Sequence, residues 1–125
     1  MPAPADHDLD LLLLITGHGL FDEKARAGLD LALVSATFEQ KTAVVFWQQG
    51  ITQLLAAQDP QKREGKNLLA RIQAFPLYDL NEVYVATEQL AQYSLNAEQL
   101  GYPAQLLPEK QVAALIERAR HTLVF

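Results

Sequence analysis

Apolar residues gather in short unbroken runs along the chain. The runs at residues 9–15, 42–47 and 82–86 are rich in leucine, β-branched and aromatic residues and show almost no polar alternation. A run of this length and composition is typical of a strand that is buried on both faces of a parallel sheet. Two shorter runs, at residues 105–107 and 122–125, predict further strands.

The segments between these runs space their apolar residues by three and four positions, which indicates helices with one buried face. We expect helices over residues 23–38, 51–57, 67–75, 88–93 and 108–120. Strands that alternate with helices in this way predict right-handed crossovers and helices on both faces of the sheet. The expected fold class is therefore α/β, a three-layer α/β/α sandwich with a mostly parallel sheet of about five strands.

Several residues suit the ends of these helices. Asn67 and Thr87 carry side chains that can cap a helix start, and Pro76 should stop the helix before it. Pro108 suits the first position of the last helix. Basic side chains favour a helix C-terminus, and the expected end of that helix carries three: Arg118, Arg120 and His121.

We expect a single domain over residues 9–125, preceded by a flexible N-terminal tail over residues 1–8. The first five residues include two prolines and no large apolar residue after Met1, so they can bury little surface. The apolar run at 9–15 is too short to cross a bilayer and follows an acidic segment, whereas a secretory signal begins with basic residues. No membrane association and a cytoplasmic location are expected.

Charge and cysteine content narrow the possible functions. The 125 residues include 10 basic and 15 acidic side chains, a formal net charge of −5 that disfavours direct binding to nucleic acid. The chain contains no cysteine, which excludes disulfides, thiolate metal ligands and cysteine nucleophiles. No cofactor is expected.

In open parallel sheets, chemistry collects beyond the carboxyl ends of the strands, here residues 16–23, 48–51 and 86–88. Gly17-His18-Gly19 follows the first strand, but Asp22 replaces the third glycine of a dinucleotide-binding loop and its carboxylate would repel phosphate. An ordinary loop is the favoured interpretation of these glycines.

Nucleophilic catalysis and metal binding are both disfavoured. His18 could act as a base, but Ser35 and Ser94 lie in or at the end of expected helices, where neither is exposed by a nucleophile turn. The acidic segment from Asp6 to Asp10 lies on the expected tail, which cannot preorganise a metal site. A cluster of basic residues indicates either a solvated loop or a contact with an acidic partner or RNA; it comprises Lys62, Arg63, Lys66 and Arg71.

Two aromatic residues fall at the ends of expected elements. Trp47 ends the second strand and Tyr78 precedes the third, and we expect both rings on one rim of the sheet. Large exposed rings favour a partner surface. We therefore predict a partner interface that includes Trp47, Gln48, Gln49 and Tyr78, with no catalytic, cofactor or metal residue.

Several short motifs stand in a recognisable order and spacing. They are Gly28-Leu29-Asp30, Phe46-Trp47-Gln48-Gln49-Gly50-Ile51, Gln53-Leu54-Leu55, Gln58 with Pro60, Leu77-Tyr78-Asp79, Val83-Tyr84-Val85 and Leu123-Val124-Phe125. In this order the chain resembles the DsrE/DsrF-like family of small sulfur-relay proteins, and within it the TusC/DsrF branch.

The resemblance implies assembly with two paralogues, of the DsrE/TusD and DsrH/TusB types, into a dimer of heterotrimers. In that family the DsrE/TusD chain carries sulfur as a persulfide on a cysteine just after a central strand, for 2-thiouridine formation in tRNA or for sulfur oxidation. The corresponding strand end here is Val85-Ala86-Thr87, which has no thiol. Gln49 also departs from the family, where an acidic residue often precedes the glycine.

A persulfide requires a thiolate, which no other side chain replaces. The sequence therefore predicts a non-catalytic structural subunit of a cytoplasmic sulfurtransferase complex of the TusBCD/DsrEFH type, with tRNA thiolation as the favoured pathway. The alternative is a stand-alone homo-oligomeric α/β module that binds a small anionic or thiol ligand near His18 and Gly50.

Overall fold

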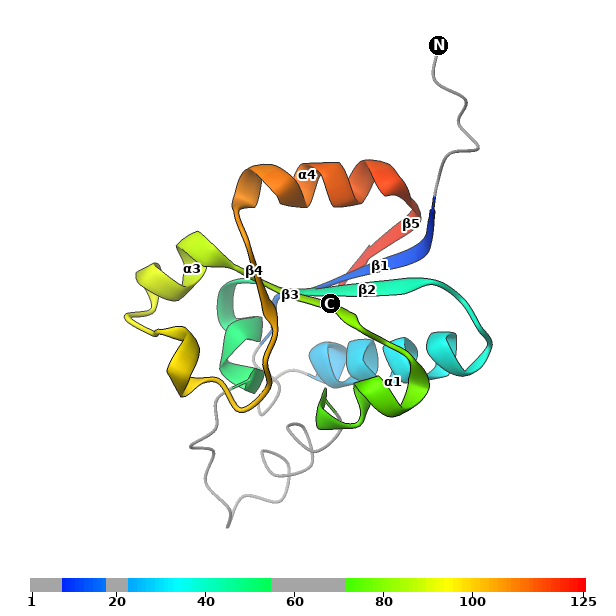
Figure 1. Ribbon diagram of the computed structural model, residues 1–125, viewed down its shortest axis with the longest axis horizontal. Helices are drawn as coiled ribbons and strands as arrows, with labels where there is room; N and C mark the ends of the chain where they lie inside the picture. Colours follow the sequence, from blue (N-terminus) through cyan, green and yellow to red (C-terminus); the bar gives the residue numbers. More distant parts are fainter. Residues whose placement is uncertain (1–7, 18–22, 55–71) are drawn as a thin grey trace.

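Five parallel strands form the sheet at the centre of the computed structural model, which describes residues 8–17, 23–54 and 72–125 (Figure 1). Across the sheet the strands are β4 (Gln105–Leu107), β3 (Glu82–Ala86), β2 (Thr42–Phe46), β1 (Leu9–Ile15) and β5 (Ala119–Val124). Leu13 pairs with Val44 of β2 on one side and with Leu123 of β5 on the other. The predicted parallel sheet is confirmed.

The direction of each crossover decides which face a helix covers. The path from β1 through β2 and β3 to β4 always moves toward the same side of the sheet, whereas the path from β4 to β5 returns across it. Right-handed crossovers then place α4 (Glu109–Arg118) on the face opposite α1 (Glu23–Thr37), as Figure 1 shows. The three-layer sandwich is confirmed.

Further short helices complete the layer that contains α1. These are the 3₁₀ helices η1 (Gln48–Leu54) and η2 (Phe75–Tyr78), the α-helix α3 (Thr87–Gln92) and the 3₁₀ helix η3 (Ala97–Gln99). Residues 48–54 form a 3₁₀ helix where a short helix over 51–57 was expected, and residues 55–57 lie outside the described residues.

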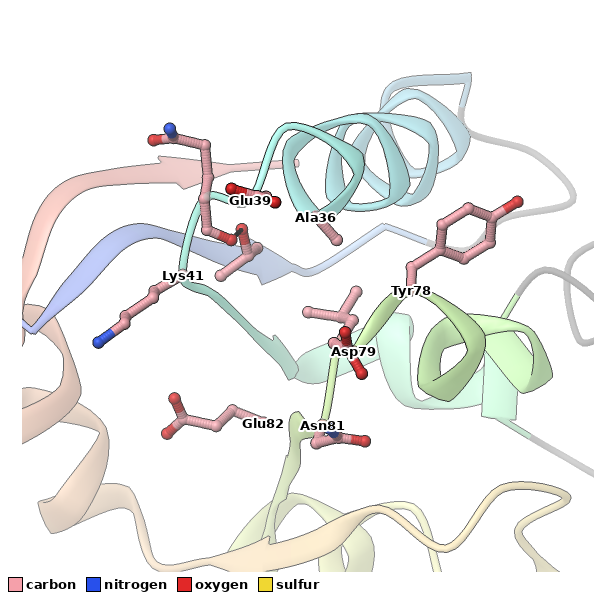
Figure 2. Close-up of a pocket in the computed structure, with 10 residues that line it drawn as sticks. Ala36, Glu39, Lys41, Tyr78, Asp79, Asn81 and Glu82 are labelled. Atoms are coloured by element: carbon pink, nitrogen blue, oxygen red, sulfur yellow. Dashed lines mark hydrogen bonds between the residues drawn. The ribbon is translucent and has the colours of Figure 1, made fainter.

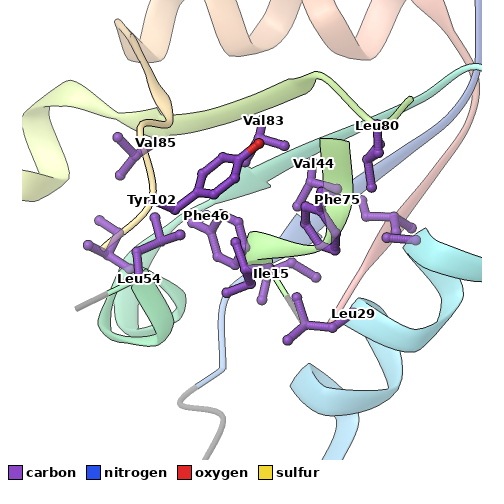
Figure 3. Packing of buried hydrophobic residues seen from close by; sticks show 14 of the residues in the cluster. Ile15, Leu29, Val44, Phe46, Leu54, Phe75, Leu80, Val83, Val85 and Tyr102 are labelled. Atoms are coloured by element: carbon purple, nitrogen blue, oxygen red, sulfur yellow. The ribbon is translucent and has the colours of Figure 1, made fainter. Parts of the chain in front are cut away.

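The larger part of the core lies between the sheet and the layer of α1. Alternate strand residues such as Leu13, Val44 and Val83 pack there against Leu29 of α1 and Phe75 of η2 (Figure 3). The other face of β1 and β2 packs against α4 in a second cluster. Strands whose two faces are both buried explain why the sequence runs are apolar without alternation.

Two predicted helix starts are wrong. Thr87 is the first residue of α3, and Ala86 occupies the cap position with no side-chain hydrogen bond. Pro108 is likewise the cap residue of α4 rather than its first helical residue, with extended backbone angles. Each helix follows its strand so closely that the cap is the last strand residue, Ala86, or the residue directly after the strand, Pro108.

The last strand begins earlier than predicted. β5 starts at Ala119, directly after α4, because Ala119 pairs with Leu9 of β1. Arg120 and His121 therefore lie in β5 and not at a helix end. Arg118 does end α4, and its guanidinium binds both carboxylate oxygens of Asp8 at 2.8 and 2.9 Å.

The segment around Pro76 also departs from the prediction. Ile72 and Gln73 are helical, and this helix ends before Pro76 as predicted, but at Gln73 rather than at residue 75. The separate 3₁₀ helix η2 follows, with Pro76 inside it. Asn67 and the start of this helix lie outside the described residues. Over the described ranges, no helix is long and apolar enough to cross a membrane.

Candidate functional site

The ends of β1 and β2 and the turns that follow them build the carboxyl edge of the sheet. The N–H of Trp47 donates to the carbonyl oxygen of Ile15 at 2.9 Å, so the turn after β2 folds over the end of β1. The N–H of Gly50 donates in turn to the carbonyl oxygen of Trp47 at 3.0 Å. These backbone bonds fix the position of Gln48 and Gln49 between them.

Gly50 is buried at the point of closest approach. A Cβ atom built on it would collide with the backbone carbonyl of Ile15, so only glycine fits without moving β1. Gln48 adopts a left-handed backbone with φ of 54°. Because non-glycine residues rarely adopt this conformation, the turn is held by its surroundings rather than by local preference.

An open hollow of about 620 Å³ lies at this edge. Its lining consists of four glutamines, one threonine and one tyrosine: Thr16, Gln48, Gln49, Gln89, Gln92 and Tyr93. Primary amides both donate and accept hydrogen bonds, but they are not nucleophiles and do not titrate near neutral pH. The described lining is therefore suited to binding polar groups.

Gln89 connects the hollow to the start of α4. Its side chain is only 8% exposed, and its Nε2 donates to Oε1 of Glu109 at 3.0 Å. Glu88 next to it accepts the backbone N–H of Glu109 at 3.1 Å. A carboxylate from α3 thus caps α4, where Pro108 offers no capping side chain.

Thr16 joins the hollow to the end of β5. Its backbone N–H and its hydroxyl both donate to the carbonyl oxygen of Phe125, at 2.6 and 2.9 Å. The N–H of Gly17 donates to the same oxygen at 3.2 Å. The carboxyl ends of β1 and β5 are therefore held together at the border of the site.

Trp47 lies at this edge as expected, and its ring is half-buried. It packs against the second core cluster together with Tyr84 of β3, on the face covered by α4. The ring therefore has one side against the core and another that reaches the surface.

Tyr78 lies at the opposite edge, so the expectation that it shares a rim with Trp47 is wrong. Tyr78 borders a second hollow, of about 510 Å³, beside the amino ends of β2 and β3 (Figure 2). The lining includes Glu39, Lys41, Asp79 and Glu82. The physical reason is that η2 enters β3 at its start, whereas Trp47 leaves β2 at its end.

At the amino edge, on the side of α4, Arg118 forms ion pairs with two carboxylates. Arg118 binds Asp8 and also approaches Oε1 of Glu82 at 3.4 Å, and the Tyr84 hydroxyl donates to that same oxygen at 2.9 Å. The Arg118 hydrogen bond lowers the pKa of Asp8, and burial followed by the Glu82 contact raises the pKa of Tyr84.

The other described candidates, the two serines, lie on separate elements. Ser35 is buried in α1, and Ser94 is exposed after α3 with φ of 55°. His18 and the basic cluster at residues 62–71 lie outside the described residues. Within the described ranges, no group of three or more metal-ligating side chains occurs.

Sequence reasoning found part of the carboxyl-edge hollow and missed the rest. Thr16, Gln48 and Gln49 lie in the segments marked as strand ends, whereas Gln89, Gln92 and Tyr93 were not singled out. Gln89 lies one residue beyond the marked segment 86–88, so the strand-end rule nearly reached it. No sequence signal identified Gln92 or Tyr93, which come from the far end of α3.

Comparison with known proteins matches this chain to one family over nearly its whole length. A model of the DsrE/DsrF-like family matches residues 10–125. A TusC homolog from Vibrio parahaemolyticus is 33% identical over 100 residues, which covers 80% of this chain and 85% of the relative. A TusC homolog from Pseudomonas aeruginosa is 30% identical over 94 residues, covering 75% and 79%.

A solved structure shares the fold. The crystal structure of the ychN protein from E. coli superposes with a TM-score of 0.81, covering 94% of this chain and 99% of that chain. The two sequences are 16% identical, so this similarity concerns the fold alone.

Proposed function

The chain belongs to the DsrE/DsrF-like family, and from this premise we propose that it is a non-catalytic structural subunit of a sulfur-relay complex of the TusBCD/DsrEFH type. It would support persulfide transfer by a cysteine-bearing paralogue in the cytoplasm, for 2-thiouridine formation in tRNA. Its partners would be DsrE/TusD-like and DsrH/TusB-like paralogues in a dimer of heterotrimers.

The absence of a thiol at the β3–α3 junction carries this proposal. Ala86 and Thr87 occupy the strand end where the resemblance implies the sulfur-carrying cysteine of the DsrE/TusD chain, and the whole sequence contains no cysteine. Transfer of a persulfide sulfur requires a thiolate that attacks the terminal sulfur and displaces the donor thiolate. The amides that line the adjacent hollow cannot perform this attack.

The carboxyl edge is suited to contact with a partner instead. Trp47 presents a half-buried ring, and Gln48 and Gln49 are exposed beside it with amides that donate and accept hydrogen bonds. Aromatic rings with polar neighbours are typical of the centres of protein interfaces. We therefore assign Trp47, Gln48 and Gln49 to one partner contact.

Coexpression with the two paralogues tests the proposed assembly. The expected result is one species in native mass spectrometry that contains all three chains, each present twice. Failure of this chain to join the paralogues, or a homo-oligomer that excludes them, would contradict the proposal and favour the stand-alone binding module.

Sulfur loading tests the non-catalytic role separately. The isolated chain is incubated with a cysteine desulfurase and labelled cysteine, and its intact mass is measured with and without reductant. An unchanged mass is expected, because no thiolate is available to accept sulfur. A reductant-sensitive gain of one sulfur per chain would contradict this role.

Substitution of Trp47 tests the assigned contact. Trp47→Ala should weaken assembly by about thirtyfold, the effect of losing a central aromatic of about 2 kcal/mol. Trp47→Phe, which retains a ring, should weaken it much less. Circular dichroism must show that both variants remain folded, and unchanged affinity of a folded Trp47→Ala variant would remove this contact from the interface.

A further inference from the structure

Exposed apolar residues include one that lines the hollow at the amino edge and two that are next in sequence to residues that line it. Phe38 is 72% exposed, Leu77 is 83% exposed and Tyr78 is 45% exposed. Phe38 immediately precedes Glu39, and Leu77 immediately precedes Tyr78, and both Glu39 and Tyr78 line the hollow. We call Phe38, Leu77 and Tyr78 together the amino-edge patch.

The two segments that carry the patch are held in place by packing. The end of α1 packs against η2, and Figure 2 shows Tyr78 extending from η2 beside α1. Ala36 faces the hollow from α1 and is partly buried. Leu77 and Tyr78 therefore stand on a packed helix and Phe38 directly follows one, which lowers the conformational cost of binding a partner there.

Negative charge borders the patch on both sides. Glu39 follows Phe38 and Asp79 follows Tyr78, each with φ of 61°. Among the described residues, neither carboxylate forms a hydrogen bond or an ion pair. Of the described residues that line the hollow, Lys41 is the one with a basic side chain, against the carboxylates of Glu39, Asp79 and Glu82.

An apolar patch bordered by unpaired carboxylates is complementary to an apolar segment that carries lysine or arginine. Carboxylates repel the phosphates of a nucleic acid. They also disfavour symmetric pairing with a second copy of this chain, because such pairing would bring the Glu39 and Asp79 carboxylates of both copies together.

We propose that the amino-edge patch is a second subunit interface, which binds an apolar segment of a DsrE/DsrF-like paralogue that carries arginine or lysine. This inference rests on the proposed function, because a chain that contacts both other members of a heterotrimer needs two separate surfaces. The carboxyl edge around Trp47 provides one surface, and the amino-edge patch provides the other at the opposite edge of the sheet.

Three variants of the full chain test this proposal in the coexpressed complex. Phe38→Ser with Leu77→Ser removes the apolar contact, and Glu39→Gln with Asp79→Asn removes the charge but keeps the shape. Ile116→Ser with Val124→Ser is the matched control, since these residues are also exposed and apolar but lie on α4 and β5. Circular dichroism and thermal melts establish that each variant is folded.

Affinity for the purified paralogues is then measured at low and high salt. Each patch variant should bind at least about tenfold more weakly than the wild type, while the control variant binds as the wild type does. Wild-type affinity should fall as salt rises, and the charge-neutral variant should lose most of this dependence. These results together would support the assignment.

Other outcomes overturn it in distinguishable ways. Wild-type assembly with unchanged affinity in both patch variants overturns this inference and leaves the proposed function standing. An equal loss in the control variant also overturns it. Failure of the wild type to assemble overturns the proposed function and this inference with it. If sedimentation shows a wild-type homodimer that the patch substitutions dissociate, the patch binds a second copy of this chain. That result overturns a paralogue as the partner.

Discussion

At the carboxyl edge of the sheet the hollow is lined by amides and hydroxyl groups, whereas at the amino edge the lining includes three carboxylates and one ammonium group. The same strands build both edges. The exposed side chains around the two hollows also differ, with glutamines at the first and Phe38 and Leu77 at the second.

This difference shows that the architecture of a site does not determine which chemical groups line it. The carboxyl edge keeps the geometry of a parallel-sheet site, including a strand end, a tight glycine turn and a hollow. Among the described residues, the lining of its hollow includes neither a thiol nor a carboxylate. The lining of the hollow at the amino edge, where parallel sheets seldom place their chemistry, includes three carboxylates, so the two hollows are suited to different contacts.

Gly50→Ala should have the largest effect on stability among the variants that separate the two edges, because it disrupts the carboxyl edge alone. The added methyl group would force the turn away from the Ile15 carbonyl, and we expect the free energy of unfolding to fall by about 3 kcal/mol. Urea denaturation followed by circular dichroism measures this loss. Gly28→Ala is the matched control.

A Cβ atom at Gly28 meets the side chains of Ile15 and Phe125 rather than backbone. Side chains can move, and alanine favours the helix, so the loss at Gly28 should be clearly smaller. Equal losses at the two glycines would show that backbone contact at the Gly50 turn is not what stabilises the carboxyl edge.

Glu88→Ala should have an intermediate effect at the same edge. The carboxylate of Glu88 accepts the first N–H of α4, and loss of such a cap costs about 1 kcal/mol of stability. Glu88→Gln retains an acceptor oxygen and should cost less. Thermal melts compare the two variants, and an unchanged melting temperature in Glu88→Ala would show that water replaces the carboxylate without cost.

Asp8→Asn should have the smallest effect on stability. It tests whether the pH dependence of stability arises at the amino edge. Arg118 lowers the pKa of Asp8 from its ordinary value of 3.8, so the ion pair stabilises the fold above that value. This stabilisation is lost as the pH falls through the lowered pKa of the folded state. The pair is exposed, so water screens it and the effect is small.

The measurement compares the urea midpoints of wild type and Asp8→Asn at neutral pH and at about pH 3. The difference should shrink at the lower pH and also in high salt. A difference that stays the same at both pH values would mean that Asp8 acts through packing or backbone contacts rather than through its charge.

The three inner strands β1, β2 and β3 could be predicted closely from the sequence, because burial on both faces leaves a nearly uninterrupted apolar run. The start of β5 could not. Ala119 continues the apolar spacing of Val112 and Leu115 in α4, so local pattern favours helix up to that residue. Pairing of Ala119 with Leu9, 110 residues away in the chain, overrides the local preference.

The two edges differ in predictability for a related reason. In parallel sheets, sites lie beyond the carboxyl ends of the strands. Knowing where the strands end is therefore enough to predict Thr16, Gln48 and Gln49 as candidates at the carboxyl edge. The amino edge combines the loop after α1 with the turn after η2. Only tertiary packing brings Glu39 near Asp79, and no rule of sequence spacing indicates it.

The placement of β5 beside β1 has a consequence for the order of folding. β1 pairs with β2 early in the chain, but its other side is covered only by residues 119–124. During synthesis β1 would present an open hydrogen-bonding edge until residues 119–124 had left the ribosome. Contacts between residues so distant in sequence slow folding, and an open apolar edge invites pairing with other chains. Newly made chains should therefore depend on chaperones, or on early capture by partner subunits, more than the compact final fold suggests.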